Sequence, residues 1–215
     1  GIATSSGFAF GTIYLSGDRW SRFGEPQALG MDLAVTEDVA MSITFTGFDP
    51  FTSSFGENAI IDTTGGPLNG TLSDITLSSS MGLFAFWNAT YTPNDNFSGT
   101  DEISFKVCNP NNSFGDCSTT DGIVSITVSP VNDLPVISEI ADVAFDEDGS
   151  YTVAISYSDI DSDPTISSVI SSEEAVTISL DGNNLTIDSA DDYFGSSSIT
   201  VTVSDEDASI AEQFT

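Results

Sequence analysis

Two parts of the sequence match each other at a nearly constant spacing. Residues 35–45 match residues 145–155 at an offset of 110 (147 − 37), and residues 91–107 match residues 187–203 at an offset of 96 (203 − 107). The fall in the offset means that the first copy has 14 more residues (110 − 96) between its two matching parts. A repeat of ~100 residues has the length of one β-sandwich domain, so the chain is predicted to contain two copies of one such unit.

Alternation of apolar and polar residues predicts that both copies are built from strands. In residues 103–107, Ile, Phe and Val alternate with Ser and Lys, and in residues 124–128, Val, Ile and Val alternate with Ser and Thr. A period of two residues is typical of half-buried strands. No stretch keeps the 3.6-residue period of an amphipathic helix. The sequence therefore predicts an all-β protein with almost no helix.

The charge of the chain excludes several classes of function. Asp and Glu number 33 against 3 Lys and Arg, the formal net charge is −30, and there is no histidine. Nucleic-acid binding depends on Lys and Arg, so no nucleic-acid partner is expected, and anionic lipid is disfavoured for the same reason. Without histidine, Ser-His-Asp catalysis and the usual zinc sites are excluded. Acidic excess opposes compaction unless it is offset, so bound cations and a solvating surface are the two explanations that remain.

A linker motif carries a resemblance to a known family. The stretch from Tyr91 to Asp133, which closes on Pro130-Val131-Asn132-Asp133, resembles the end of one cadherin-like repeat and the linker to the next in large bacterial-type surface adhesins. The resemblance implies two cadherin/immunoglobulin-like β-sandwiches in tandem, over residues 30–132 and 133–215. Residues 1–29 would be a strand-like extension, namely an extra strand, the tail of a preceding domain, or an arm donated to a neighbour.

The same resemblance implies calcium at the joint between the two sandwiches. In cadherin-like tandems, calcium is held by acidic residues at the base of the upper domain, by the Asn/Asp linker, and by a D-x-D loop with a later Asp at the top of the lower domain. Calcium takes six to eight oxygen ligands, which such clusters supply. Asp is also a common solvated turn residue, which is the alternative interpretation. The candidate ligands here are Glu37, Asp101, Asn132, Asp133, Asp159, Asp161 and Asp205.

Departures from this pattern limit where calcium is expected. The offset of 110 places Asp49 on Asp159, but Asp49 is followed by Pro50, and Asn109 stands where the second copy has Asp205. A calcium site at the top of the first domain is therefore not expected. At the base of the second domain Ser197 replaces Asp101, so a downstream site is predicted to be weaker.

The two cysteines, Cys108 and Cys117, flank a turn-rich loop between two predicted strands. A disulfide across such a loop is geometrically reasonable and implies an oxidising compartment, whereas two buried free thiols are the alternative. The aromatic run of Phe84, Phe86, Trp87 and Tyr91 has two interpretations as well. It is a core strand by its alternation, or a platform on which sugars stack.

The main functional hypothesis is a structural or adhesive repeat pair, extracellular or at the cell surface, stiffened by calcium and belonging to a longer adhesin or filament. Its expected partners are neighbouring repeats or like subunits, with no enzymatic activity. No apolar run approaches the ~20 residues that span a bilayer, so no membrane insertion is expected in this segment. The chain starts at Gly1 without a signal peptide, which is expected of a piece of a longer precursor.

Three other hypotheses remain. One is a carbohydrate-binding module of a secreted polysaccharide-degrading protein, with surface glycans as ligands. Another is a glycosidase using paired carboxylates, against which the clustering of acidic residues at domain ends argues. The last is a filament subunit. The second domain ends before a full counterpart of residues 123–128, and residues 8–15 are apolar and strand-like, so one subunit's arm could complete its neighbour.

Overall fold

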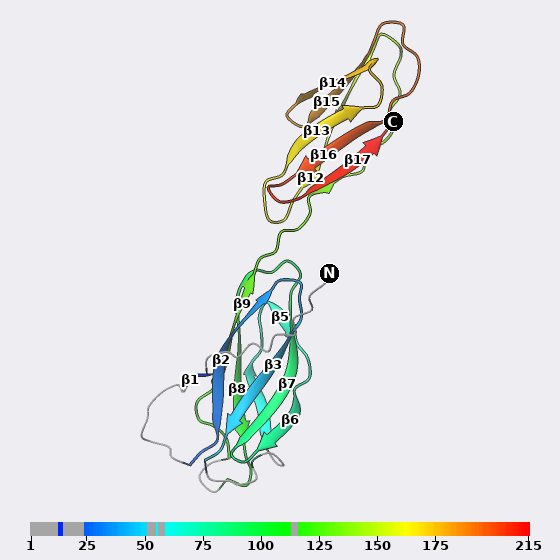
Figure 1. Cartoon of the computed structure of the whole chain (residues 1–215). Coiled ribbons are helices and arrows are strands. Elements are labelled where there is room, and N and C mark those ends of the chain that lie inside the picture. Colours follow the sequence, from blue (N-terminus) through cyan, green and yellow to red (C-terminus); the bar gives the residue numbers. More distant parts are fainter. Residues whose placement is uncertain (1–12, 15–23, 51–54, 56–58, 113–115) are drawn as a thin grey trace. The chain divides into compact units, whose positions relative to one another are not determined.

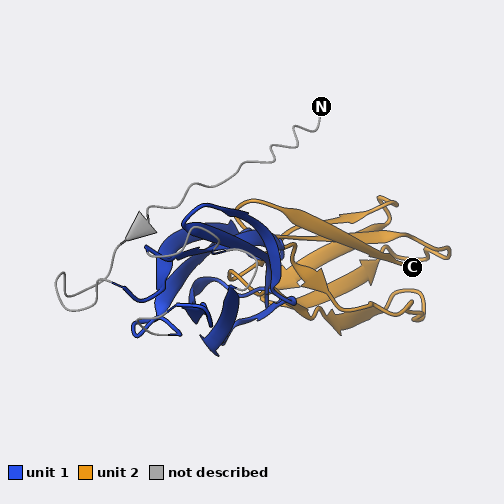
Figure 2. Ribbon diagram, turned by 90° about the horizontal axis from the view of Figure 1, so that it is seen from below, with its two compact units in different colours: residues 1–131 blue, residues 132–215 orange. Residues whose placement is uncertain are grey.

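The computed structural model shows an all-β chain that divides into two compact units, Gly1–Val131 and Asn132–Thr215. Figure 2 colours the two units separately. The structure describes residues 13–14, 24–50, 55, 59–112 and 116–215. No helix in this part of the chain is long and apolar enough to cross a membrane. The prediction of two immunoglobulin-like sandwiches built from strands is confirmed.

Unit 1 is one continuous set of paired strands that folds over into a sandwich. Its strands follow the order β4-β8-β9-β2-β3-β7-β5, with β1 paired to β2 and β6 paired to β7 (Figure 1). The strands of unit 1 are β1 Ile13–Tyr14, β2 Gln27–Thr36, β3 Met41–Phe48, β4 Ile60–Gly65, β5 Gly70–Leu72, β6 Thr76–Met81, β7 Phe84–Pro93, β8 Gly99–Cys108 and β9 Gly122–Ser129.

Strand β2 links the two layers because it changes partner along its length. Residues 27–29 pair antiparallel with β3, whereas residues 31–36 pair parallel with β9. Gly30 lies at the change, where an added Cβ would approach the carbonyl oxygen of Ile123 to 2.6 Å. A side chain there would clash with backbone, so this crossing needs glycine.

Between the layers lies a continuous apolar core. The inward residues of β3 and β7 meet those of β8 and β9, and Phe45 contacts Phe105 edge-to-face with ring centroids 5.0 Å apart. Alternate positions of β8 and β9 are buried, as the two-residue period predicts. The fully buried large residues of unit 1 include Ile43, Phe45, Phe55, Tyr91, Ile103, Phe105, Val107 and Val124.

Unit 2 repeats this arrangement with shorter strands in three small sheets, β10-β12, β11-β15-β14 and β13-β16-β17. The offset of 96 carries β8 onto β16, so the buried Ile199, Val201 and Val203 take the places of core residues of unit 1. The strands of unit 2 are β10 Val136–Ile137, β11 Ser150–Ala154, β12 Tyr157–Ser158, β13 Thr165–Ser171, β14 Val176–Asp181, β15 Asn184–Ser189, β16 Ile199–Ser204 and β17 Ser209–Phe214.

The two ends of the chain bear on the filament hypothesis. Phe214 pairs with Ile199 as Val124 pairs with Ile103, so β17 is the counterpart of the first part of β9. Most of the N-terminal extension, residues 1–12 and 15–23, lies outside the described residues, and β1 pairs antiparallel with β2 of its own unit. Donation of this arm to a neighbour stays a prediction.

The acidic end of unit 2, a candidate calcium site

Two loops and the linker supply the acidic residues at one end of unit 2. Asp159 directly follows β12, Asp205 directly follows β16, and Asn132 and Asp133 precede β10. The backbone N–H of Asp133 donates to Asp161 Oδ2 at 2.8 Å, and Asn132 Nδ2 donates to Asp205 Oδ2 at 3.0 Å. All five predicted ligands in this unit therefore lie at the same end, and the linker is hydrogen-bonded to both loops.

The two carboxylate oxygens of Asp159 differ in their hydrogen bonds. Its Oδ1 accepts hydrogen bonds from the backbone N–H of Asp161 and Ser162, both at 2.8 Å, and from Ser162 Oγ at 3.1 Å. Its Oδ2 is buried and has no hydrogen-bond partner among the described residues. A buried carboxylate oxygen without a partner is costly, and a bound cation would remove that cost.

Asp205 is held as an anion by neighbouring donors. The Asn132 amide and the backbone N–H groups of Ala208 and Asp207 all donate to it. These hydrogen bonds, that of Asn132 first, lower the pKa of the Asp205 carboxyl. The same hydrogen bonds therefore favour the ionised form of this side chain.

The equivalent end of unit 1 shows what is different in unit 2. There the buried carboxylate of Asp49 accepts a hydrogen bond from Asn109 Nδ2 at 2.7 Å, and Asn112 Nδ2 donates to both Asp49 oxygens at 3.0 Å. The repeat places Asp159 where Asp49 stands and Asp205 where Asn109 stands. Unit 2 thus has a second carboxylate where unit 1 has an amide donor.

The structure does not gather these carboxylates into a closed ligand sphere. Within the described ranges, no group of three or more His, Cys, Asp or Glu side chains is arranged to hold a metal ion. The donor set still fits calcium better than zinc, because it contains only oxygen, the chain has no histidine, and both cysteines are in a disulfide. Calcium binding would therefore require these side chains to rearrange.

The two predicted ligands in unit 1 already have structural partners. Glu37 is buried, and its carboxylate accepts a hydrogen bond from the backbone N–H of Val131 at 2.5 Å. Asp101 Oδ1 accepts from the N–H of Leu68 and from its neighbour Glu102, both at 2.9 Å. Its Oδ2 accepts from the N–H of Asn69 and from the hydroxyl of Tyr91, both at 3.0 Å.

This role of Asp101 was missed by sequence reasoning, although a signal for it exists. Asp101 has the same parity along β8 as Ile103 and Phe105, which places it on the inward face. An acidic residue on an inward position needs internal donors. Burial, and next the hydrogen bond to Asp101, raise the pKa of the Tyr91 hydroxyl far above its usual value.

Comparison with known proteins decides the family. A family model described as "Bacterial Ig domain" matches residues 25–127 and again residues 132–214. The chain belongs to the bacterial Ig domain family. No curated protein matches the sequence.

Several solved structures are similar to the chain at low identity. Titin domains I67–I69, in an E-to-A mutated variant, are 9% identical, with 88% of this chain and 64% of that chain covered and a TM-score of 0.34. The tandem Ig repeats of Dlar are 13% identical, covering 89% and 97%, with a TM-score of 0.27. The neural ectodermal development factor IMP-L2 is 7% identical, covering 90% and 91%, with a TM-score of 0.28. This chain thus spans just under two thirds of the titin segment.

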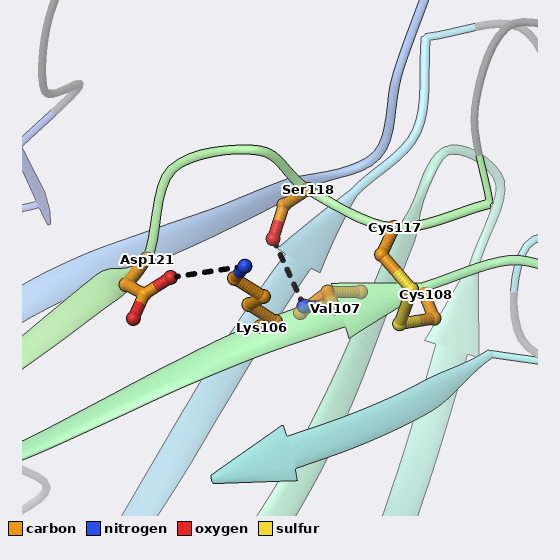
Figure 3. The surroundings of a disulfide bond; sticks show 6 residues. All are labelled: Lys106, Val107, Cys108, Cys117, Ser118 and Asp121. Carbon is orange, nitrogen blue, oxygen red and sulfur yellow. Dashed lines mark hydrogen bonds and ion pairs between the residues drawn. A yellow bond between two sulfur atoms is a disulfide. The ribbon is translucent and has the colours of Figure 1, made fainter. Parts of the chain in front are cut away.

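The first bacterial Ig domain contains the predicted disulfide. Figure 3 shows Cys108 at the end of β8 bonded to Cys117, with an S–S distance of 2.06 Å. Beside it, the backbone N–H of Val107 donates to Ser118 Oγ at 3.2 Å, and Lys106 Nζ lies 3.7 Å from Asp121 Oδ1. The prediction of a disulfide is confirmed. Family and disulfide together indicate an extracellular or surface protein.

Removal of this disulfide is expected to destabilise unit 1 without unfolding it. In the Cys108→Ser/Cys117→Ser variant, the free energy of unfolding should fall by about 2–3 kcal/mol, because the unfolded chain is no longer constrained by the closed loop. Urea unfolding followed by tryptophan fluorescence measures this, since Trp20 and Trp87 both belong to unit 1. Two alkylatable thiols in the native, unreduced protein would contradict the disulfide itself.

The aromatic run in β7 is partly core and partly surface. Trp87 and Tyr91 are buried, as a core strand predicts. The core-strand interpretation is wrong for Phe84, which is 37% exposed, and for Phe86, which is half-buried. Along β7, Ala85 and Trp87 take the inward positions, so the alternation turns both phenylalanines outward.

Proposed function

We propose that this pair of bacterial Ig domains is a structural repeat of a surface protein, in which calcium bound at the acidic end of unit 2 stiffens the linker. The observation that carries the proposal is the buried Oδ2 of Asp159, which has no hydrogen-bond partner among the described residues. Asp159 lies on the loop after β12, and the neighbouring loop after β16 has Asp205 where unit 1 has the amide donor Asn109.

In the proposed site, Asp133, Asp159, Asp161 and Asp205 would supply carboxylate oxygens, and Asn132 would orient Asp205. Calcium would supply positive charge, so that mutual repulsion no longer opposes close packing of these side chains. Asp101 is not in this set, because its two oxygens already accept four hydrogen bonds. Glu37 as a ligand stays a prediction.

The mechanical consequence follows from the position of the linker. Asn132 and Asp133 are hydrogen-bonded to the loops that carry Asp205 and Asp161. A cation shared by those loops and Asp133 would hold the linker against unit 2 and reduce its freedom. Bacterial Ig domains are typically structural modules without catalytic activity, and a repeat with a stiff linker serves that purpose.

Calcium is expected to stabilise unit 2 and to leave unit 1 unchanged. At a free calcium concentration 100 times the Kd, the gain is about 2.7 kcal/mol, because calcium binds only the folded unit. Differential scanning calorimetry of the full chain with calcium, with magnesium and with EDTA measures the two transitions. Small-angle scattering of the same samples should show a narrower range of chain dimensions with calcium.

Matched variants separate a specific site from general charge screening. Asp205→Asn should remove the response to calcium, since it restores the amide that unit 1 has at this position. Asp181→Asn removes the same charge from an exposed position at the end of β14 and should respond as the wild type does. The proposal fails if calcium does not change the unit 2 transition, or if both variants lose the response equally.

A further inference from the structure

One face of unit 1 differs from the rest of the chain in its charge. Residues 39–48 and 75–94 contain no Asp, Glu, Lys or Arg, although 17% of all residues are charged and the net charge is −30. These stretches include all of β3, β6 and β7, which lie side by side in the order β3-β7-β6 (Figure 1). In a chain so rich in carboxylates, an exposed sheet without them is a distinct surface.

Aromatic side chains gather at one end of this sheet, on its outer side. Phe48 and Phe84 are paired across β3 and β7, and their ring centroids are 5.0 Å apart. The rings of Phe84 and Phe86 are nearly parallel, at 16°, with centroids 6.4 Å apart. Met81, opposite Phe84 on β6, is 71% exposed. Apolar surface of this extent is left in water although the unit has a complete core of its own.

A row of polar groups continues the same face. The Thr44 hydroxyl donates to Asn88 Oδ1 at 3.0 Å, and Asn88 Nδ2 donates to Ser78 Oγ at 3.2 Å. Asn88 lies two residues beyond Phe86 on β7, so the polar row is next to the aromatic rings. We call Phe48, Phe84, Phe86, Met81, Thr44, Asn88 and Ser78 the neutral face.

We propose that the neutral face binds an uncharged polysaccharide. Such a chain presents flat C–H surfaces, which fit the nearly parallel rings of Phe84 and Phe86, and hydroxyl groups, which fit the amide and hydroxyls beside them. Among the described residues, no Lys or Arg lies on this face to bind an anionic glycan or a phosphate. Lys106, on the other layer of the sandwich, is paired with Asp121. The proposal is independent of calcium in unit 2.

The test uses the full chain and pull-down with insoluble neutral polysaccharides, namely cellulose, chitin and starch, beside the anionic alginate. The wild type should bind at least one neutral polymer and not alginate. Phe84→Ala/Phe86→Ala should weaken that binding about tenfold or more, because the stacking surface is lost. Phe194→Ala is the matched control, since Phe194 is 88% exposed in unit 2, and it should bind as the wild type does.

Two further measurements keep the test decisive. Calorimetry of Phe84→Ala/Phe86→Ala should show an intact unit 1 transition, and NMR titration of the wild type with a soluble fragment of the bound polymer should shift phenylalanine ring signals. The proposal is overturned if no neutral polymer binds, or if Phe194→Ala weakens binding equally. It is also overturned if sedimentation shows that the face joins two copies of the chain, with the double variant monomeric.

Discussion

An Asn109→Asp variant is expected to lose about 3–5 kcal/mol of stability in unit 1 at neutral pH. The substitution replaces the amide that donates to Asp49 at 2.7 Å with a second carboxylate, and both positions are buried, at 2% and 0% exposure. Two buried like charges at this distance repel strongly, and water cannot screen them. Unit 1 would then have the pair of carboxylates that unit 2 has in Asp159 and Asp205.

The loss of stability in Asn109→Asp is expected to increase with pH. Repulsion and burial would raise the pKa of the carboxyl pair in the folded variant above the ~3.9 of an unfolded Asp. The cost is therefore small near pH 3 and grows as the pH rises through that range. Urea unfolding of the variant and wild type at several pH values, followed by tryptophan fluorescence, measures it.

Asn111→Asp is the control for this variant, because Asn111 belongs to the same loop but is exposed. It should change stability by less than ~0.5 kcal/mol. If Asn109→Asp is as stable as the control at neutral pH, the Asp49–Asn109 hydrogen bond does not stabilise unit 1, and the contrast drawn with unit 2 loses its basis.

The fold could be predicted because a repeat in sequence is a repeat in structure. The offset of 96 places Ile103 on Ile199, and both are buried in central strands of their units. The change of partner along β2 could not be predicted, since it depends on which strands come together in space. In the sequence, only Gly30 indicates this change of partner, because a residue without a side chain is needed where the backbone of Ile123 comes close.

The site was predictable by residue type but not by geometry. Acidic residues at strand ends identified the loops of unit 2, yet the pattern cannot show which oxygens already have donors. The parity of Asp101 with Ile103 and Phe105 indicates an inward position, but it cannot show that the N–H groups of Leu68 and Asn69 donate to Asp101 there. The sequence also could not show which of Phe84 and Trp87 is buried. Both alternating sets of residues in this strand are apolar, so either set could face the core, and the packing of neighbouring strands decides which one does.

Asp101→Ala is expected to destabilise unit 1 by about 3–5 kcal/mol, with or without calcium. The buried carboxylate accepts three backbone N–H groups and the Tyr91 hydroxyl, and alanine would leave these donors unsatisfied. The N–H groups of Leu68 and Asn69 belong to the connection between β4 and β5, so that segment should lose its attachment to β8.

Glu102→Ala provides the comparison, because Glu102 is the next residue on β8 and its side chain is exposed. It should change the free energy of unfolding by no more than ~0.5 kcal/mol. Unfolding of both variants in calcium and in EDTA then separates two roles for Asp101. A loss of equal size in both solutions identifies Asp101 as the anchor of the β4–β5 connection. A loss that appears only with calcium would instead identify a ligand, and the calcium set proposed for unit 2 would have to be extended into unit 1.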